Sequence, residues 1–171
     1  EEAYDRPADL ATDGAVVIDA LRDLVARLRA EGETAKFMVL LEATSPLRAV
    51  SDVRDCLALL ADQNLDSVAT FKDADLPPAK AWRLNGHVPT PYLENANPWL
   101  PRQKTEAAMQ LSGAVYAFDM DKLPDTGNAL LFGMSGAVMM PRSRCVDIDD
   151  EMDFTIAEAM ILKGHDDKHA S

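Results

Sequence analysis

The sequence lacks both a hydrophobic run long enough to cross a membrane and an excess of basic residues. A membrane-spanning helix needs roughly 18–20 consecutive apolar residues, whereas the longest candidates, Phe37–Leu41 and Ala137–Met140, are only the length of a strand. The 17 basic residues are outnumbered by 29 acidic ones, which gives a net charge of −12. A protein that binds a phosphate backbone needs the opposite sign. The composition therefore argues against a membrane span and against nucleic-acid binding.

Cysteine and glycine are also scarce, and neither forms a known motif. The two cysteines, Cys56 and Cys145, are too few for a disulfide framework or a zinc site. Because unpaired cysteines are usually buried, we expect both to be small, reduced core residues, and we expect a cytoplasmic location. The eight glycines include no G-x-G-x-x-G and no Walker loop. If the chain handles a nucleotide, its main phosphate cradle is not visible in these residues.

An alternation of helical and strand patterns is present instead. The 171 residues, 47% of them hydrophobic, suit one domain of ordinary size. Apolar residues at helical spacing predict three helices, with N-caps at Thr12–Asp13, Ser51 and Asp150. Continuous apolar runs predict strands at 37–42, 67–71, 113–118 and 137–140. Because such runs suit strands covered on both faces, the predicted fold class is α/β with a mostly parallel sheet.

The alternation stops between Lys72 and Gln110. This stretch holds six of the ten prolines and both tryptophans, Trp82 and Trp99, and has no clear period. A long irregular stretch inside a compact domain usually forms an interface or a functional loop. We therefore expect it to be an insert within the single domain.

The clearest candidate for chemistry is the acidic run from Asp147 to Asp153. Alternation in an extended segment places Asp147 and Asp149 on one side, where two carboxylates can hold a divalent cation that phosphate oxygens also bind. The same run suits a solvated turn followed by a capped helix. Thr44 and Ser45 follow the predicted strand 37–42, where ligands of open α/β sheets lie. They either bind a ligand or shape the turn. The residues alone do not decide between these two roles, nor between a metal site and a capped helix start for the acidic run.

Four segments together resemble the acylneuraminate cytidylyltransferases, the CMP-sialic acid synthetase family. They are Arg6–Asp13, Leu41–Arg48, Arg102–Gln103 leading to Leu111–Tyr116, and Asp147–Glu158. The resemblance implies a three-layer, Rossmann-like α/β fold and one domain, 1–171, in which 72–110 is the dimerisation and substrate insert. Members of this family open with a strand and a CTP-binding loop rich in Gly, Arg and Lys, and the match begins after them. Either the protein lacks this element or, as Glu1 in place of Met favours, the domain is truncated at its N-terminus in this sequence.

The activity that this resemblance implies is transfer of CMP from CTP to the anomeric hydroxyl of a nonulosonic acid, a nine-carbon 2-keto acid sugar, with release of pyrophosphate. The implied cofactor is Mg²⁺, which neutralises phosphate oxygens in such reactions. Asp147 and Asp149 would bind the metal and act in catalysis, and Arg6 would bind the nucleotide. The residues implied to face the sugar are Glu42, Thr44, Ser45, Lys80, Arg102, Gln110 and Ser112. The expected assembly is a homodimer, with no membrane or nucleic-acid partner.

Three of the sugar-facing positions depart from the family's pattern. Glu42 stands where glutamine is usual, Gln110 where arginine is common, and Ser112 where asparagine precedes the glycine. The first two changes make the site more negative, which disfavours sialic acid itself and favours a differently decorated relative. Two alternatives remain. One is the related enzyme for 3-deoxy-manno-octulosonate, which usually has the motif Gly-Asp-Glu-Pro at the strand end where this chain has Ala43-Thr44-Ser45-Pro46. The other is a non-catalytic dimerising module.

Overall fold

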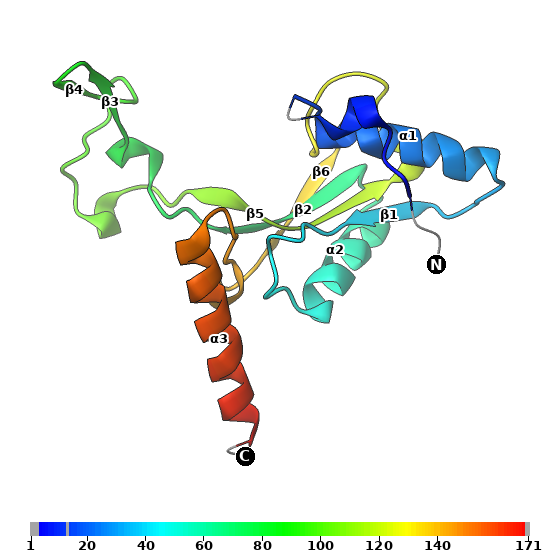
Figure 1. Cartoon of the computed structure of the whole chain (residues 1–171). Helices are drawn as coiled ribbons and strands as arrows, with labels where there is room; N and C mark the ends of the chain where they lie inside the picture. The colour runs from blue at the N-terminus through cyan, green and yellow to red at the C-terminus, as the bar shows by residue number, and fades with distance from the viewer. Residues whose placement is uncertain (1–3, 13, 170–171) are drawn as a thin grey trace.

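The computed structural model describes residues 4–12 and 14–169, and the side chains of those up to residue 163, as an α/β fold (Figure 1). The α-helices are α1 (Val17–Ala30), α2 (Val50–Asp62) and α3 (Glu151–His169). The strands are β1 (Phe37–Leu40), β2 (Ser67–Asp73), β3 (Trp82–Asn85), β4 (Val88–Pro91), β5 (Met109–Asp119) and β6 (Ser135–Met139). Within the described residues, none of the helices combines the length and the apolar character that crossing a bilayer requires.

The main sheet is mixed, with the strand order β1-β5-β2-β6. β2 and β6 pair in parallel, whereas β5 runs antiparallel to both of its neighbours, β1 and β2. All four predicted segments lie in this one open sheet, and β1, β2 and β6 run in the same direction. The prediction of a mostly parallel sheet is therefore wrong only for β5, which lies reversed between β1 and β2. An apolar run such as 113–118 has the same pattern in either direction, so only its pairing partners decide the orientation.

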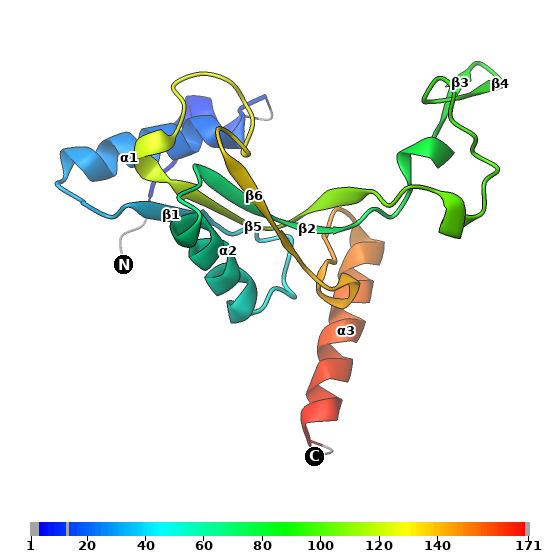
Figure 2. The same cartoon turned by 180° about the vertical axis from the view of Figure 1, so that it is seen from behind.

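Side chains alternate between the two faces of the sheet, and each face is covered by its own helix. Val68 packs with Cys56 and Leu60 of α2, whereas its neighbour Ala69 packs with Leu21 of α1. Figures 1 and 2 show the two helices on opposite sides of the strands. The predicted inner face of the second helix, which includes Cys56 and Leu60, is confirmed. Burial of these apolar side chains is the main favourable contribution to folding.

Both cysteines are buried, free thiols, as the sequence predicts. Burial is the main reason that the pKa of Cys56 rises to about 12, and the charges of Asp52 and Asp55 act in the same direction. Burial also raises the pKa of Cys145, whose Sγ donates a hydrogen bond to the Pro141 carbonyl at 3.3 Å. A thiol with a raised pKa stays protonated at neutral pH, so both residues act as inert parts of the core.

The helix starts differ from the sequence-based expectation at α1 and α2. α1 begins well after Thr12, which therefore does not cap it, and Asp13 lies outside the described residues. α2 includes Ser51 as a helical residue rather than as its cap. The side-chain hydrogen bond at this helix start comes from inside the helix, because the Asp52 carboxylate accepts from the N–H of Ala49, the residue before α2, at 2.7 Å. This is the half of a capping box that the third helical residue supplies.

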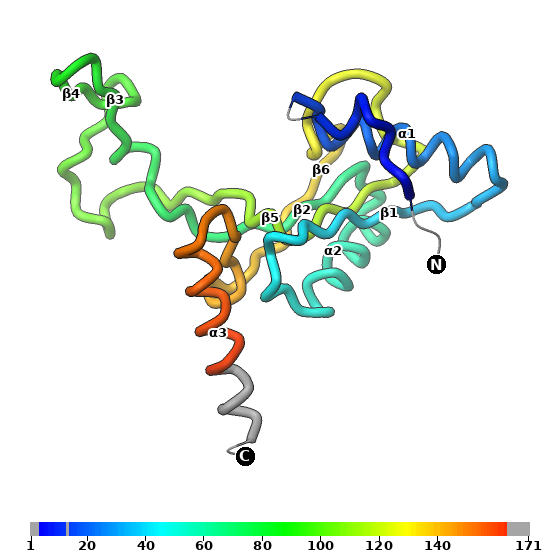
Figure 3. Tube along the Cα trace, viewed as in Figure 1, coloured from blue at the N-terminus to red at the C-terminus, as the bar shows by residue number. Residues whose placement is uncertain are grey.

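The stretch between β2 and β5 is more regular than its sequence pattern indicates. β3 and β4 form an antiparallel hairpin that extends beyond the sheet, at the opposite end of the molecule from α1 (Figures 1 and 3). We call residues 76–107 the arm. Trp82 and Trp99 pack edge to face within it, with ring centroids 5.8 Å apart, and Trp99 is 81% exposed. The arm therefore presents aromatic surface to solvent.

Candidate functional site

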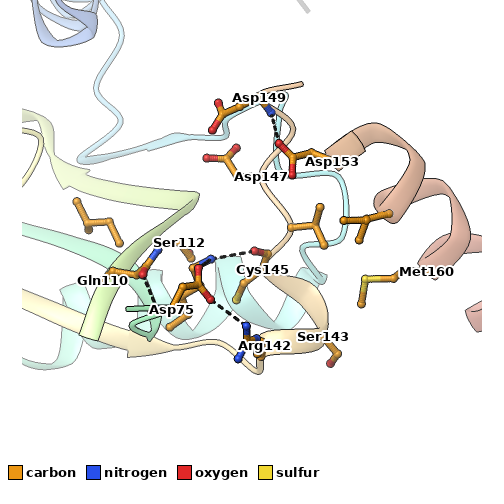
Figure 4. Close-up of a pocket in the computed structure, with 14 residues that line it drawn as sticks. Asp75, Gln110, Ser112, Arg142, Ser143, Cys145, Asp147, Asp149, Asp153 and Met160 are labelled. Atoms are coloured by element: carbon orange, nitrogen blue, oxygen red, sulfur yellow. Dashed lines mark hydrogen bonds and ion pairs between the residues drawn. The ribbon is translucent and has the colours of Figure 1, made fainter. Parts of the chain in front are cut away.

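A cavity of about 800 Å³ opens where β2 and β6 end and β5 begins. Its walls come from the ends of these strands, from the segment between β6 and α3, and from one side of α3 (Figure 4). Ligands of open α/β sheets usually lie at the carboxyl ends of strands, where several loops converge. The lining residues are Lys72, Asp75, Gln110, Leu111, Ser112, Arg142, Ser143, Cys145, Val146, Asp147, Asp149, Asp153, Ile156 and Met160.

Three of the segments singled out in the sequence meet at Gly113. A β-carbon placed on Gly113 would lie 3.5 Å from Oδ2 of Asp147 and 3.6 Å from Oγ of Ser45. The loops that carry these groups are joined by a hydrogen bond from the Ile148 N–H to the Thr44 carbonyl, at 2.9 Å. Gly113 has a φ of +75°, a conformation that L side chains rarely adopt. A glycine here therefore allows this backbone conformation within β5 and leaves space between the two polar groups.

Asp147 and Ser45 each have a buried side-chain oxygen without a hydrogen-bond partner among the described residues. The two atoms are Asp147 Oδ1 and Ser45 Oγ. A buried polar atom that lacks a partner costs roughly 1–3 kcal/mol. The arrangement is thus unfavourable until a ligand or an ion satisfies these oxygens. Because Asp147 Oδ1 is part of a carboxylate, a cation is the group that would satisfy it best.

Asp147 and Asp149 lie on the same side of the segment that leads into α3 (Figure 4). Asp149 is exposed, and its backbone N–H donates to Oδ2 of Asp153 at 3.1 Å. In the described part of the chain, no group of three or more His, Cys, Asp or Glu residues is arranged to hold a metal ion. A divalent cation between the two carboxylates would therefore need oxygens from a bound ligand to complete its coordination shell, and phosphate oxygens are suitable.

The predicted N-cap of α3 is confirmed. Oδ1 of Asp150 accepts hydrogen bonds from the N–H groups of Met152 and Asp153, at 2.8 and 2.9 Å. In return, Oδ2 of Asp153 accepts from the Asp150 N–H at 3.2 Å. This reciprocal arrangement satisfies donors that the start of a helix leaves without partners. Asp150 therefore has a structural role, unlike Asp147 with its unpartnered oxygen.

Replacing Asp150 by Ala should lower the free energy of unfolding by about 1 kcal/mol, because two backbone N–H groups lose their acceptor. The matched control is Glu151→Ala, which removes the same charge from the helix start but leaves these hydrogen bonds intact. Urea unfolding followed by circular dichroism measures both variants. Equal effects of the two substitutions would contradict the capping role.

Two of the predicted sugar-facing residues line the cavity, and three lie in the loop after β1. Gln110 and Ser112 line the wall formed by β5. The Ser112 hydroxyl is engaged within the protein, since it donates to Oγ1 of Thr70 at 2.7 Å. This hydrogen bond holds β5 where its register against β2 shifts. The loop after β1 carries Glu42, which is half-buried, together with Thr44 and Ser45.

Lys80, Arg102 and Arg6 lie away from the cavity of their own chain. The Lys80 ammonium donates to two backbone carbonyls of the arm, the nearer at 2.8 Å. Arg102 borders a smaller hollow of about 220 Å³ where the arm joins the sheet. The segment that holds Arg6 runs along α1, to which the Tyr4 hydroxyl donates hydrogen bonds (Figure 3). Within one chain, the structure does not bring these three cations to the aspartates.

Sequence analysis missed three charged residues of the cavity, Lys72, Asp75 and Arg142. Lys72 Nζ lies 2.8 Å from Oδ2 of Asp75, and a guanidinium nitrogen of Arg142 lies 3.2 Å from Oδ1. The hydrogen bond from Lys72 is the main reason that the pKa of Asp75 lies below its ordinary value, and the charge of Arg142 also lowers it. A signal for Lys72 existed in the sequence, because it directly follows the predicted strand 67–71, at the strand end where ligands lie.

Comparison with known proteins finds distant similarity that extends over almost the whole chain. No family model matches the sequence. The chain is similar to the post-translational flagellin modification protein B of Campylobacter coli, with 28% identity over 168 residues. The aligned region covers 94% of this chain and 68% of the relative. The similarity therefore extends over nearly all of the fold described above rather than over a single motif.

Proposed function

We propose that this protein is a cytidylyltransferase that moves CMP from CTP to the anomeric hydroxyl of a nonulosonic acid and releases pyrophosphate. The observation that carries the proposal is the meeting of Ser45, Gly113 and Asp147, from three separate motifs, with two buried oxygens left without partners. The similarity to a flagellin modification protein supports it, because a CMP-linked sugar is an activated donor for modifying a protein after translation.

In this proposal, Asp147 and Asp149 hold the metal and the loop after β1 orients the sugar. Mg²⁺, when bound, would neutralise the phosphate oxygens and align the reacting groups. The sugar hydroxyl oxygen forms a bond to the α-phosphorus while the bond from that phosphorus to the bridging oxygen breaks. Pyrophosphate carries away that electron pair, and the hydroxyl proton passes to solvent. Thr44 and Ser45 would place their hydroxyls on the sugar, across the space that Gly113 leaves open.

The test is pyrophosphate release from CTP by the full-length protein. The acceptors are a panel of nine-carbon 2-keto acid sugars, with 3-deoxy-manno-octulosonate and no sugar as controls. We expect release that requires both a nine-carbon sugar and Mg²⁺. Release with 3-deoxy-manno-octulosonate alone would identify the related enzyme instead. A protein that neither binds CTP nor releases pyrophosphate with any acceptor would be the non-catalytic module.

We further infer that the arm forms the interface of a homodimer. Leu84 and Val88 of its hairpin are 73% and 63% exposed, and Trp99 is more exposed still. Exposed large apolar and aromatic side chains are typical of interfaces. A second copy would also explain how Lys80 and Arg102 come to face a sugar, since neither reaches the cavity of its own chain.

Light scattering of the intact protein at tens of micromolar should give the mass of a dimer. Replacing both Leu84 and Trp99 by Ser should give a monomer, because the variant removes apolar area that only a partner would cover. The matched control is Val50→Ser, at a residue that is 67% exposed at the start of α2 and should leave the mass unchanged. A parent protein with the mass of a monomer would contradict the inference.

A further inference from the structure

The cavity has two ends of opposite charge. Figure 4 shows Asp147 and Asp149 at one end and Asp75 with Arg142 at the other. Lys72 belongs to the second end, since its ammonium lies 2.8 Å from the Asp75 carboxylate. Two cations share one carboxylate there, which leaves a net charge of +1. A binding site that is negative at one end and positive at the other favours a ligand whose own charges are separated in the opposite sense.

Lys72 is held so that its charge faces the cavity rather than bulk water. Its side chain is only 13% exposed, and it lies near the end of β2, in the cavity wall. The ammonium has two acceptors among the described residues, Asp75 at 2.8 Å and the more distant Cys145 carbonyl at 3.5 Å. An ammonium group has three N–H donors, so one remains for a ligand. The apolar side chains of Ile156 and Met160 also line this cavity. Such low-dielectric walls strengthen the electrostatic attraction between a nearby charge and a ligand.

Gln110 is aligned to add a neutral donor at the same end. Its Oε1 accepts a hydrogen bond from the Asp75 N–H at 2.8 Å. With the oxygen fixed in this way, the amide NH₂ is the part of the side chain left to bind a ligand. Asp75 thus organises the end of the cavity: its carboxylate positions two cations, and its backbone positions the amide.

We propose that Lys72 and Arg142, together with the amide of Gln110, bind the carboxylate of the acceptor sugar. The inference rests on the proposed function, in which the acceptor substrate is a sugar that carries a carboxylate. One ammonium, one guanidinium and one amide NH₂ match the two oxygens and single negative charge of a carboxylate. The phosphates of CTP would lie at the other end, where Asp147 and Asp149 can share a cation with them.

Calorimetric binding to the full-length protein tests this assignment. Each nine-carbon 2-keto acid sugar of the panel is titrated as the free acid and as its methyl ester, and CTP with Mg²⁺ is titrated separately. For the tightest-binding acid, Lys72→Met should weaken binding about tenfold, the effect expected for one charge-assisted hydrogen bond. The same variant should bind the acid and the ester almost equally and should bind CTP as the parent does.

Two further variants make the result specific. Arg142 is 69% exposed, so Arg142→Met removes a cation without disturbing the core and should also weaken binding of the acid. Lys122→Met removes the same charge from an exposed position in the turn after β5 and should bind the acid as the parent does. A Lys72→Met protein that keeps the parent's preference for acid over ester would overturn the proposal, and so would a parent that shows no such preference.

The outcomes also separate this inference from the proposed function. Weaker binding of CTP, with unchanged binding of the acid, would mean that Lys72 faces a phosphate, and the assignment would be wrong. Binding of the acid that depends on Lys72, in a protein that releases no pyrophosphate from CTP, would uphold the carboxylate site and reject the transferase activity.

Discussion

Asp147→Ala should lower the turnover of CTP by about 100-fold or more, because the phosphates lose a group that holds their counter-ion. The same substitution should leave the free energy of unfolding unchanged or slightly higher. Oδ1 of Asp147 is buried without a donor among the described residues, so the folded protein loses an unfavourable feature when this carboxylate is removed. A residue retained for binding rather than for folding is expected to show this opposite pair of effects.

Two measurements on four proteins test this prediction. Pyrophosphate release at limiting and saturating Mg²⁺ gives activity, and urea unfolding gives stability. Asp149→Ala should behave like Asp147→Ala, whereas Asp150→Ala should lose stability and largely keep turnover, since Asp150 caps α3. The metal site is wrongly assigned if both Asp147→Ala and Asp149→Ala turn over like the parent at limiting Mg²⁺.

Local features of the fold were predictable from the sequence because short-range patterns determine them. The inner face of α2 follows from apolar residues at helical spacing, and Cys56 and Leu60 are buried there as expected. The cap of α3 follows from Asp150 and Asp153, three residues apart. The direction of β5 was not predictable, because it depends on which strands it pairs with. Those pairings join residues as distant in sequence as Phe37 and Asp119.

The candidate site was predictable in its parts but not in its assembly. Ser45 and Asp147 were both singled out in the sequence, yet their meeting at Gly113 depends on long-range packing. The charged end of the cavity was missed because neither Lys72 nor Arg142 belongs to a motif, and the two meet at Asp75 only through the folding of the chain. Ser112 was expected to face the sugar, and in the structure its hydroxyl donates a hydrogen bond to Oγ1 of Thr70.

An ion pair positions the segment that carries the aspartates. Arg144, in the turn after β6, pairs with the Asp52 carboxylate of α2 at 2.5 Å. The Asp52 side chain is only 4% exposed, whereas that of Arg144 is 35% exposed. The pair therefore ties the start of the segment from Cys145 to Asp149 to the first turn of α2. The two partners of this ion pair differ in what their removal would cost. Loss of Arg144 would leave the buried Asp52 carboxylate without its cation, whereas loss of Asp52 would leave an arginine that can turn toward water.

Arg144→Met should lower the free energy of unfolding by about 3 kcal/mol, near the lower end of the effects seen when one partner of a buried pair is removed. The double variant Arg144→Met with Asp52→Leu should recover part of that loss, because it removes the unpaired buried charge but also the acceptor of the Ala49 N–H. The matched control is Arg29→Met at the exposed pair with Asp121, which should change stability by less than about 1 kcal/mol. Urea unfolding of all four proteins measures the difference between the single and the double variant. A double variant as unstable as Arg144→Met would show that the buried charge of Asp52 is not the cause.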